Sequence, residues 1–378
     1  MIKLPGYVKY LIVLAAIVLT AYVLIIAKSI LSPVITALIL ALLLHPVGAG
    51  LERLRIPRGI SSLLSIVFVV LVLAGLSFFF STQVRSIGRD LNTIEAKFNQ
   101  VIDRSSEWMA GTIGIEPQEQ TNYLKDSITS LLRGSTSFLT RTLSATAGFF
   151  TAFFLAIIAL FFFLYYRKFF LDFLYRLFQS ENHKIVGTTV IKIEKVVRSY
   201  ILGLFTVILI VGVLNTTGLM ILGIEHAMFF GALAAVLTII PYIGVFIGSL
   251  LPILFALVTK DSLWYPVGVA LIFWIVQFLE GNFITPNVVG GRVSINPFAA
   301  ILALFFGGMI WGAIGMILSI PVLAITKVIF DTVPPLNPYG FLLGNPPDES
   351  TLESRRVRLK SIRKRLIRRK RLQIKEKA

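Results

Sequence analysis

The sequence predicts an all-α fold, a polytopic bundle of transmembrane helices with about eight membrane segments, two of them broken or re-entrant. Hydrophobic residues make up 56% of the 378 residues, charged residues make up 15%, and the mean hydropathy is +0.85. The apolar residues gather in runs long enough for a helix of about 20 residues, which spans ~30 Å of hydrocarbon at ~1.5 Å per residue. This composition argues against a soluble enzyme of several domains.

Residues 1–82 are expected to hold the first three spans. Their apolar runs are Tyr10–Ala27, Ile30–Val47 and Ile60–Ser81. The first run leads directly into the second, so we interpret it as a retained span and not as a cleaved signal peptide, which would precede a polar mature chain.

Residues 83–142 turn polar, with seven acidic and seven basic side chains between Gln83 and Arg141. Apolar residues recur at helical spacing from Ile87 to Ile102, which predicts an extracytoplasmic insertion built from amphipathic helices. The apolar stripe has two interpretations, contact with a partner or packing on its own neighbours and the membrane surface.

Residues 143–200 are expected to form a fourth span and a basic cytoplasmic helical segment. Basic residues are in excess between Arg167 and Arg198, and also in the short Arg53–Arg58 loop. The positive-inside rule places both basic segments in the cytoplasm and the neutral insertion outside. The N-terminus is therefore expected inside, and the C-terminus also returns to the cytoplasm.

Residues 201–331 form the predicted core transport region. A fifth span is expected over Ile201–Leu222, and another over Trp264–Phe283. Two further apolar runs, Met228–Val258 and the run after Pro297, are interrupted by proline and glycine. Each run is too long for one crossing and too short for two, so each is either one kinked span or a re-entrant hairpin. Two span-plus-hairpin units of opposite orientation would resemble the inverted repeats of secondary transporters.

Polar residues inside this apolar region are the candidate binding residues. Glu280 follows the run FWIVQFL, and Gln277 precedes it by one helical turn on the same face. An ionisable side chain in the membrane normally faces protein or a water-filled cavity, although Glu280 can also be a solvated carboxylate at the membrane surface. Asn282 is a further candidate, and Asn215 is either a ligand or a hydrogen-bonding contact between helices. The expected ligands are a polar solute, a sodium ion or a proton.

Glycine and proline mark the places where the helices are expected to break. Backbone groups freed at such breaks must line a cavity or be buried in protein, which makes these positions candidates for gating. The alternative is that they only allow close packing. The candidates are Pro241, Gly244, Gly248, Gly290, Gly291, Pro297, Gly307, Gly308 and Gly312.

Residues 332–378 form a linker and a basic cytoplasmic tail. From Glu349 onward the tail carries thirteen basic and three acidic residues, which supplies +10 of the net charge of +17. Its expected role is binding to anionic lipid, at about 1 kcal/mol per basic residue near the surface. Nucleic acid is not an expected partner, because aromatic residues for base stacking are absent after Phe341. The residues expected at the lipid surface are Arg363, Arg365, Arg368 and Arg369.

Several classes of chemistry lack their residues in this sequence. The chain has no cysteine and only three histidines, His45, His183 and His226, which are far apart. A thiolate metal site, a cysteine nucleophile and a zinc-binding histidine pair are therefore not expected. No Gly-Lys dipeptide is present, which removes the phosphate-binding loop of a nucleotide motor. We expect no enzymatic activity, no metal and no cofactor.

The core motifs resemble the autoinducer-2 exporter family of bacterial permeases. The resemblance rests on Ile240–Gly244, on Glu280-Gly281-Asn282 with Pro286 and Gly290, on Asn296-Pro297, and on the closing glycines with Pro321. It extends to about Asp331 and leaves out the basic tail. It implies a multi-pass protein of the bacterial inner membrane, a homo-oligomer that exports a small polar solute or signalling molecule. The alternatives are a sodium or proton antiporter and, in another class, a membrane scaffold without transport.

Overall fold

The computed structural model describes residues 5–113, 150–178, 183–240, 243–289 and 295–346, and the regular structure in these ranges is helical. This confirms the predicted polytopic helical bundle. The basic tail residues Arg363, Arg365, Arg368 and Arg369, and the part of the predicted insertion from residue 114 onward, lie outside the described residues.

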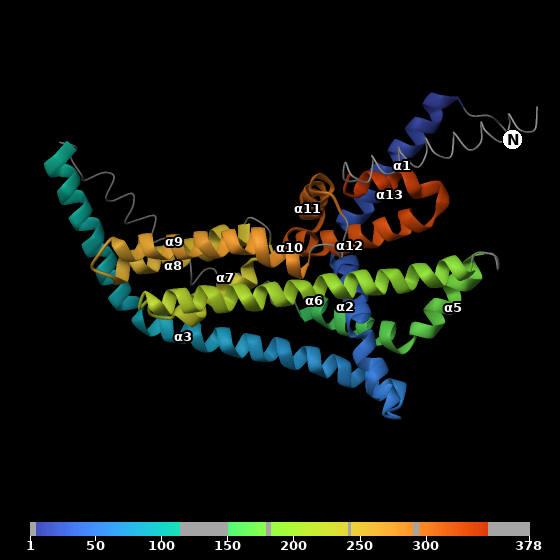
Figure 1. Cartoon of the computed structure of the whole chain (residues 1–378), viewed down its shortest axis with the longest axis horizontal. Helices are drawn as coiled ribbons and strands as arrows, with labels where there is room; N and C mark the ends of the chain where they lie inside the picture. The colour runs from blue at the N-terminus through green and yellow to red at the C-terminus, as the bar shows by residue number, and fades with distance from the viewer. Residues whose placement is uncertain (1–4, 114–149, 179–182, 241–242, 290–294, 347–378) are drawn as a thin grey trace, which may run out of the picture.

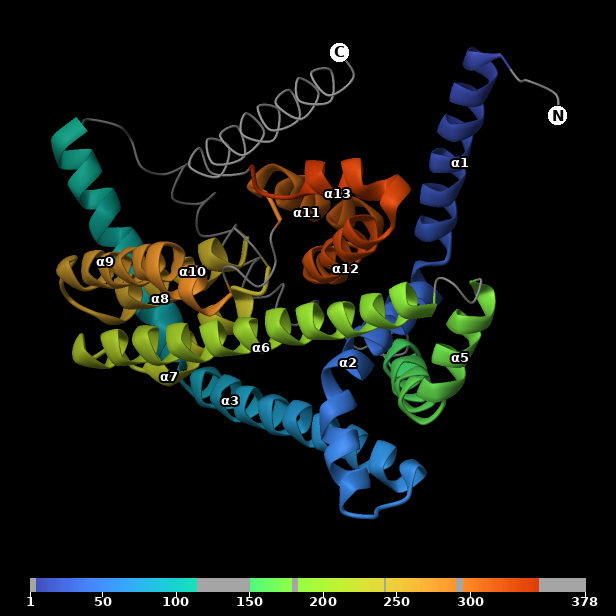
Figure 2. The same cartoon turned by 45° about the vertical axis from the view of Figure 1, so that its right-hand side comes forward.

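The first three helices are α1 (Gly6–Ile26), α2 (Lys28–Arg53) and α3 (Arg58–Ile113). In both views α1 projects away from the body of the molecule. Helix α2 continues from α1, passes α6 and ends at the lower side of the molecule, where α3 begins (Figures 1 and 2). Helix α3 is unbroken over 56 residues, about 84 Å at 1.5 Å per residue. The first part of the predicted insertion is therefore a direct continuation of the third span.

The fourth membrane segment is bent. The helix Phe150–Tyr165 and α5 (Arg167–Leu177) meet at an angle of 70°. The first of these helices packs Leu160 and Leu164 against Ala37 and Leu44 of α2 in one buried cluster. The bend turns α5 out of that cluster, and α5 has no buried residue.

Helix α6 (His183–Ile221) is the axis of the fold. It runs along the length of the bundle (Figure 1) and contacts α2, α7, α9 and α12. Val197 packs with α2 and α12, Val211 packs with α7 and α9, and Leu219 packs with α7 and α8. A hydrogen bond also fastens α2 to α6, with His45 Nδ1 2.6 Å from Glu194 Oε1.

The first broken run is a helical hairpin. Helices α7 (Ala227–Leu237) and α8 (Ile243–Thr259) lie against each other, so the chain doubles back at the break. A Cβ atom at Gly244 would lie 1.7 Å from the carbonyl oxygen of Leu237, and one at Gly248 would lie 2.8 Å from the Cα of Ala234. Glycine is required because the two backbones are in contact.

The segment after this hairpin is one long apolar helix with a change of pitch. Helix α9 (Trp264–Leu279) passes into a π-helical turn, Glu280–Ile284, and then into α10 (Thr285–Val288). The run Trp264–Val288 has 25 residues, enough to cross a membrane. It places Glu280 within a helical segment that continues beyond the predicted end of this span at Phe283.

The second broken run also forms a hairpin, from α11 (Pro297–Trp311) and α12 (Ala313–Thr332). The chain turns at Gly312, whose φ of +66° favours glycine. A Cβ at Gly307 would lie 2.0 Å from Ser319 Oγ and 2.5 Å from the carbonyl oxygen of Gly315. A 3₁₀ turn (Pro334–Leu336) and α13 (Asn337–Leu343) then fold back on α12.

Five helical segments among the described residues are long and apolar enough to cross a membrane, and the bent fourth segment is a sixth candidate. Helices α7, α8 and α11 are shorter apolar helices, as the two broken runs require. The five are α2, the Arg58–Ile87 part of α3, α6, the Trp264–Val288 segment and α12.

We expect the first hairpin to enter and leave the membrane from the outer side. A cysteine replacing the exposed Asp261, in the otherwise cysteine-free chain, should then react with a membrane-impermeant maleimide added to intact cells. The matched control is Arg176→Cys in α5, which should react only after the cells are opened. Labelling of Asp261→Cys only in opened cells would instead place the end of this hairpin on the cytoplasmic side.

We expect Gly307→Ala to destabilise the second hairpin. The new methyl group would overlap Ser319 Oγ and the Gly315 carbonyl, and overpacking of this kind costs about 1–3 kcal/mol. Thermal unfolding in detergent should show a clear loss of stability. Gly75→Ala in α3 is the control, because a Cβ there meets nothing within 4 Å.

Candidate functional site

The candidate site is built around the π-helical turn that begins at Glu280. The two carboxylate oxygens of Glu280 each accept a hydrogen bond, Oε2 from Gln277 Nε2 at 2.5 Å and Oε1 from Thr285 Oγ1 at 2.5 Å. The structure therefore brings together Gln277 and Glu280, which the sequence places one turn apart.

The π turn explains why Thr285 reaches Glu280. Residues five apart point in different directions on an α-helix, whereas a π-helix closes its hydrogen bonds between residues five apart and stacks them. The backbone N–H of Thr285 accordingly donates to the carbonyl of Glu280. The extra residue in this turn places a third polar side chain on the carboxylate.

The partners described for Glu280 are neutral. An amide and a hydroxyl satisfy its oxygens as acceptors, and no counter-charge for it is found in the part of the chain that the structure describes. An uncompensated carboxylate within an apolar segment is costly, so it attracts a cation, a proton or a positively polarised group of a solute. This is the main chemical capability of the site.

Asn215 lies on α6 and faces α9 across a small cavity. Its side chain is 2% exposed, and its Oδ1 has no hydrogen-bond partner among the described residues. The same cavity is lined by Gln277 of α9 and by Thr238 at the end of α7. Its volume of about 10 Å³ matches the minimum for one water molecule.

The cavity connects the polar side chains of three elements. Gln277 lines it and also donates to Glu280, so one side chain connects the cavity to the carboxylate. Thr238 donates its hydroxyl proton to the carbonyl of Ala234, which leaves lone pairs on its oxygen. The cavity therefore offers acceptor oxygens in an otherwise apolar wall.

Asn282 is not brought into this group. It is exposed, and its Nδ2 donates to the carbonyl of Phe278 on its own helix at 2.9 Å. The π turn directs Thr285, and not Asn282, toward Glu280. The role of Asn282 in binding stays a prediction, without a contact that links it to the carboxylate.

The predicted gating residues fall into three groups. Pro241, Gly290 and Gly291 lie outside the described residues. Gly244 and Gly248 form the backbone contact between α7 and α8, while Gly307 and Gly308 form the contact between α11 and α12. Pro297 begins α11, where Asn296 caps the helix by accepting from the N–H of Ala299 at 2.8 Å, and Gly312 forms the turn. Their gating role stays a prediction.

Sequence reasoning missed Thr285 and Thr238. Thr285 is five residues after Glu280, a spacing that α-helical periodicity does not connect. Thr238 is a single hydroxyl in an apolar run, three residues before Pro241. Its position next to a helix break was the available signal, because side chains there can reach freed backbone groups or a cavity.

Comparison with known proteins identifies the family. The family model described as "AI-2E family transporter" matches residues 11–334, which include every helix that lines the site. The match ends before the basic tail, as the sequence motifs predicted.

The chain is also similar to bacterial transport proteins along most of its length. It is 29% identical over 315 residues to "Putative transport protein YueF" of Bacillus subtilis, covering 79% of this chain and 82% of the relative. It is 27% identical over 320 residues to "Putative transport protein MT0215" of Mycobacterium tuberculosis, covering 84% and 86%. With a family model matched over nearly the whole chain, the protein belongs to the AI-2E family of membrane transporters.

Proposed function

We propose that this protein is a secondary transporter that exports a small polar organic solute or signalling molecule of the autoinducer-2 type. One observation carries the proposal: Glu280, a carboxylate in a segment long and apolar enough to cross a membrane, has neutral partners among the described residues, and its partner Gln277 lines a small cavity. A transporter requires such a group to attract its cargo or a coupling ion into the membrane.

The transport path is proposed to run between α6, α9 and the α7–α8 hairpin. At about 10 Å³ the Asn215 cavity is far too small for an organic solute, so this conformation is closed at that point. The cavity is walled by Ala234 and Val245, one from each arm of the hairpin. Movement of the hairpin away from α6 would enlarge it, which assigns the gate to the Gly244 break.

A second candidate function, cation or proton antiport, is favoured by the same cavity volume. The space next to Gln277 admits one small ion, and the uncompensated charge of Glu280 is one hydrogen bond away. Sodium prefers oxygen ligands, which Asn215 and Thr238 supply. Coupled export and simple cation antiport differ in whether the transport cycle also carries an organic solute.

Other features are proposed with the transport function. We propose a homo-oligomer in the bacterial inner membrane with both termini in the cytoplasm, without catalytic activity, metal or cofactor. Large apolar side chains on α1 are exposed, among them Ile17 and Leu19 at 61% and 63%. Lipid or a neighbouring subunit would cover such a face.

We expect Glu280→Gln to abolish transport while the protein still inserts into the membrane. Glutamine keeps the size and the hydrogen-bonding oxygen but removes the charge that attracts the ion or solute. The measurement is flux in sealed vesicles of purified protein, with autoinducer-2 and labelled sodium as probes and with imposed sodium or proton gradients. Glu225→Gln, an exposed carboxylate in the loop after α6, is the matched control.

The outcomes of this experiment separate the candidates. Solute movement driven by a gradient and lost in Glu280→Gln supports coupled export. Ion exchange without solute supports the antiporter. Full transport by a well-folded Glu280→Gln protein would remove the carboxylate from the proposal, and silence of the wild-type protein under all conditions would favour the scaffold.

We expect Asn215→Leu to stabilise the protein and to reduce transport. An unpaired buried polar atom costs about 1–3 kcal/mol, and leucine of similar shape removes that cost. Thermal unfolding should therefore shift upward while flux in vesicles falls. Thr238→Val is a second variant at the same cavity. It removes the hydrogen bond from the Thr238 hydroxyl to the Ala234 carbonyl, so it should not raise the stability of the protein. Stabilisation by Asn215→Leu with unchanged flux would make Asn215 a structural residue only.

A further inference from the structure

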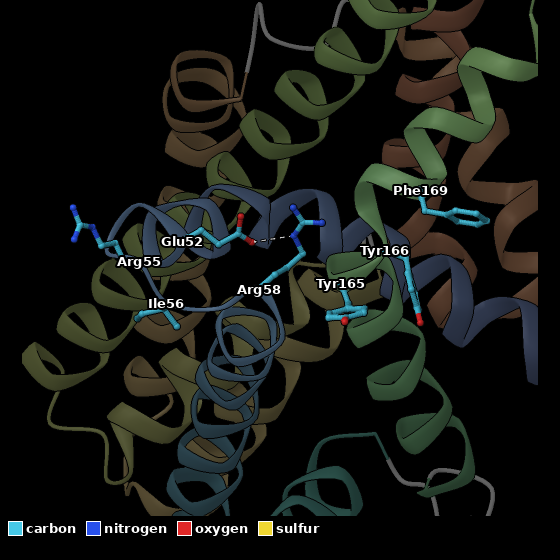
Figure 3. A pocket seen from close by; sticks show the side chains of 7 residues that line it. All are labelled: Glu52, Arg55, Ile56, Arg58, Tyr165, Tyr166 and Phe169. Atoms are coloured by element: carbon cyan, nitrogen blue, oxygen red, sulfur yellow. Dashed lines mark ion pairs between the residues drawn. The ribbon is translucent and has the colours of Figure 1, made fainter.

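A second pocket lies at the opposite end of α2 from α1, where the short loop to α3 faces the bent fourth segment. It has a volume of about 620 Å³ and is separate from the Glu280 site. Figure 3 shows Glu52 and Arg58 facing each other, Tyr165 beside Arg58, and Tyr166 with Phe169 further along the same segment. Arg55 extends outward from the loop on the other side.

The pocket carries an excess of positive charge. Glu52 is the acidic side chain in its lining, and it is already bound by Arg167, whose guanidinium donates to Glu52 Oε2. Arg55 and Arg58 add two more guanidinium groups, so these four side chains sum to +2. Neutralising the pocket requires an anion.

Arg58 has unused hydrogen-bonding capacity. Its Nε is buried and has no hydrogen-bond partner among the described residues, and the nearest paired carboxylate oxygen, Glu52 Oε1, is 3.6 Å away. The side chains of Arg58 and Arg167 are 30% and 21% exposed, so their charges are held in a partly desolvated position. Arginine in such a place suits phosphate, which accepts two parallel N–H bonds.

The pocket lies where membrane spans end. Helix α2 ends at Arg53 and α3 begins at Arg58, and both are apolar enough to cross the bilayer. The first turn of α3 points its free N–H groups toward this end, which also favours an anion. Tyr165 and Tyr166 are aromatic residues of the kind found at the level of lipid headgroups.

We propose that this pocket binds the phosphate group of an anionic phospholipid headgroup, with Arg58 as the phosphate ligand and Arg55 as a second basic group at the rim. A volume of about 620 Å³ has room for a phosphate with a glycerol moiety. Glu52 can accept from a headgroup hydroxyl, and the tyrosine and phenylalanine rings cover the first carbons of the acyl chains. The bound lipid would brace the α2–α3 loop against the bent fourth segment.

The test is retention of phosphatidylglycerol by the purified, delipidated full-length protein, counted by native mass spectrometry. Arg58→Gln and Arg55→Gln should each weaken binding about fivefold, the effect of one basic residue near an anionic surface. Arg176→Gln in α5 is the matched control, because this exposed arginine lies outside the pocket and should leave binding unchanged. The Arg55→Gln protein is expected to fold normally, because Arg55 is exposed and Glu52 keeps its bond to Arg167. Weaker binding by this variant would therefore report the lost charge and not misfolding.

Three further arms identify the source of the phosphate. Phosphatidylcholine should bind weakly and equally to all variants. Inorganic phosphate and glycerol phosphate, added at millimolar concentration, should not displace the lipid. Displacement by either would assign the pocket to a soluble phosphate compound, and equal phosphatidylglycerol binding by wild type, Arg55→Gln and Arg58→Gln would overturn the proposal.

Discussion

A helix that breaks inside a membrane must hide the backbone groups that the break sets free, and this constraint organises the structure. Both breaks are resolved by backbone contact, at Gly244 against Leu237 and at Gly307 against Gly315. Such contact is possible only when the chain doubles back, so each break makes a hairpin. Two hairpins in turn need a long wall to pack on, and α6 supplies it with buried residues from Val197 to Leu219.

The same constraint explains how the Glu280 carboxylate is accommodated in the π turn after α9. The helix widens into a π turn at Glu280, and that turn supplies Thr285 as a second donor beside Gln277. Hydrogen bonding is satisfied locally while the charge is not. Asn215 is the opposite case: its side chain is neutral, but its Oδ1 has no hydrogen-bond partner among the described residues. Unsatisfied groups that stability alone would remove are expected where a protein binds something polar.

Hydropathy predicted the helical bundle because an apolar run of sufficient length has one solution in lipid. Glycine and proline located both breaks, although they did not decide between a kinked span and a hairpin, since that depends on which backbones touch. Gln277 with Glu280 followed from helical spacing. Thr285 did not, because the π turn changes the period locally. The continuation of α3 to Ile113 was missed since the sequence turns polar at Gln83 while the backbone stays helical. The pocket at Arg58 joins segments more than a hundred residues apart.

Polar contacts join α2 to α5 and α6, whereas the α7–α8 hairpin packs mainly through apolar contacts. This difference favours the hairpin as the part that moves. A hydrogen bond between His45 and Glu194 fastens α2 to α6, and an ion pair between Glu52 and Arg167 fastens α2 to α5. The buried cluster that packs α7 and α8 against α6 and α9 is mostly apolar, and glycines bring the backbones of α7 and α8 together. Directional charged contacts hold one geometry, whereas smooth apolar surfaces repack at small cost as they slide. Alternating access to a buried polar site requires one part that stays fixed and another that moves. Here α2, α5 and α6 would form the fixed frame, and the α7–α8 hairpin would shift against it.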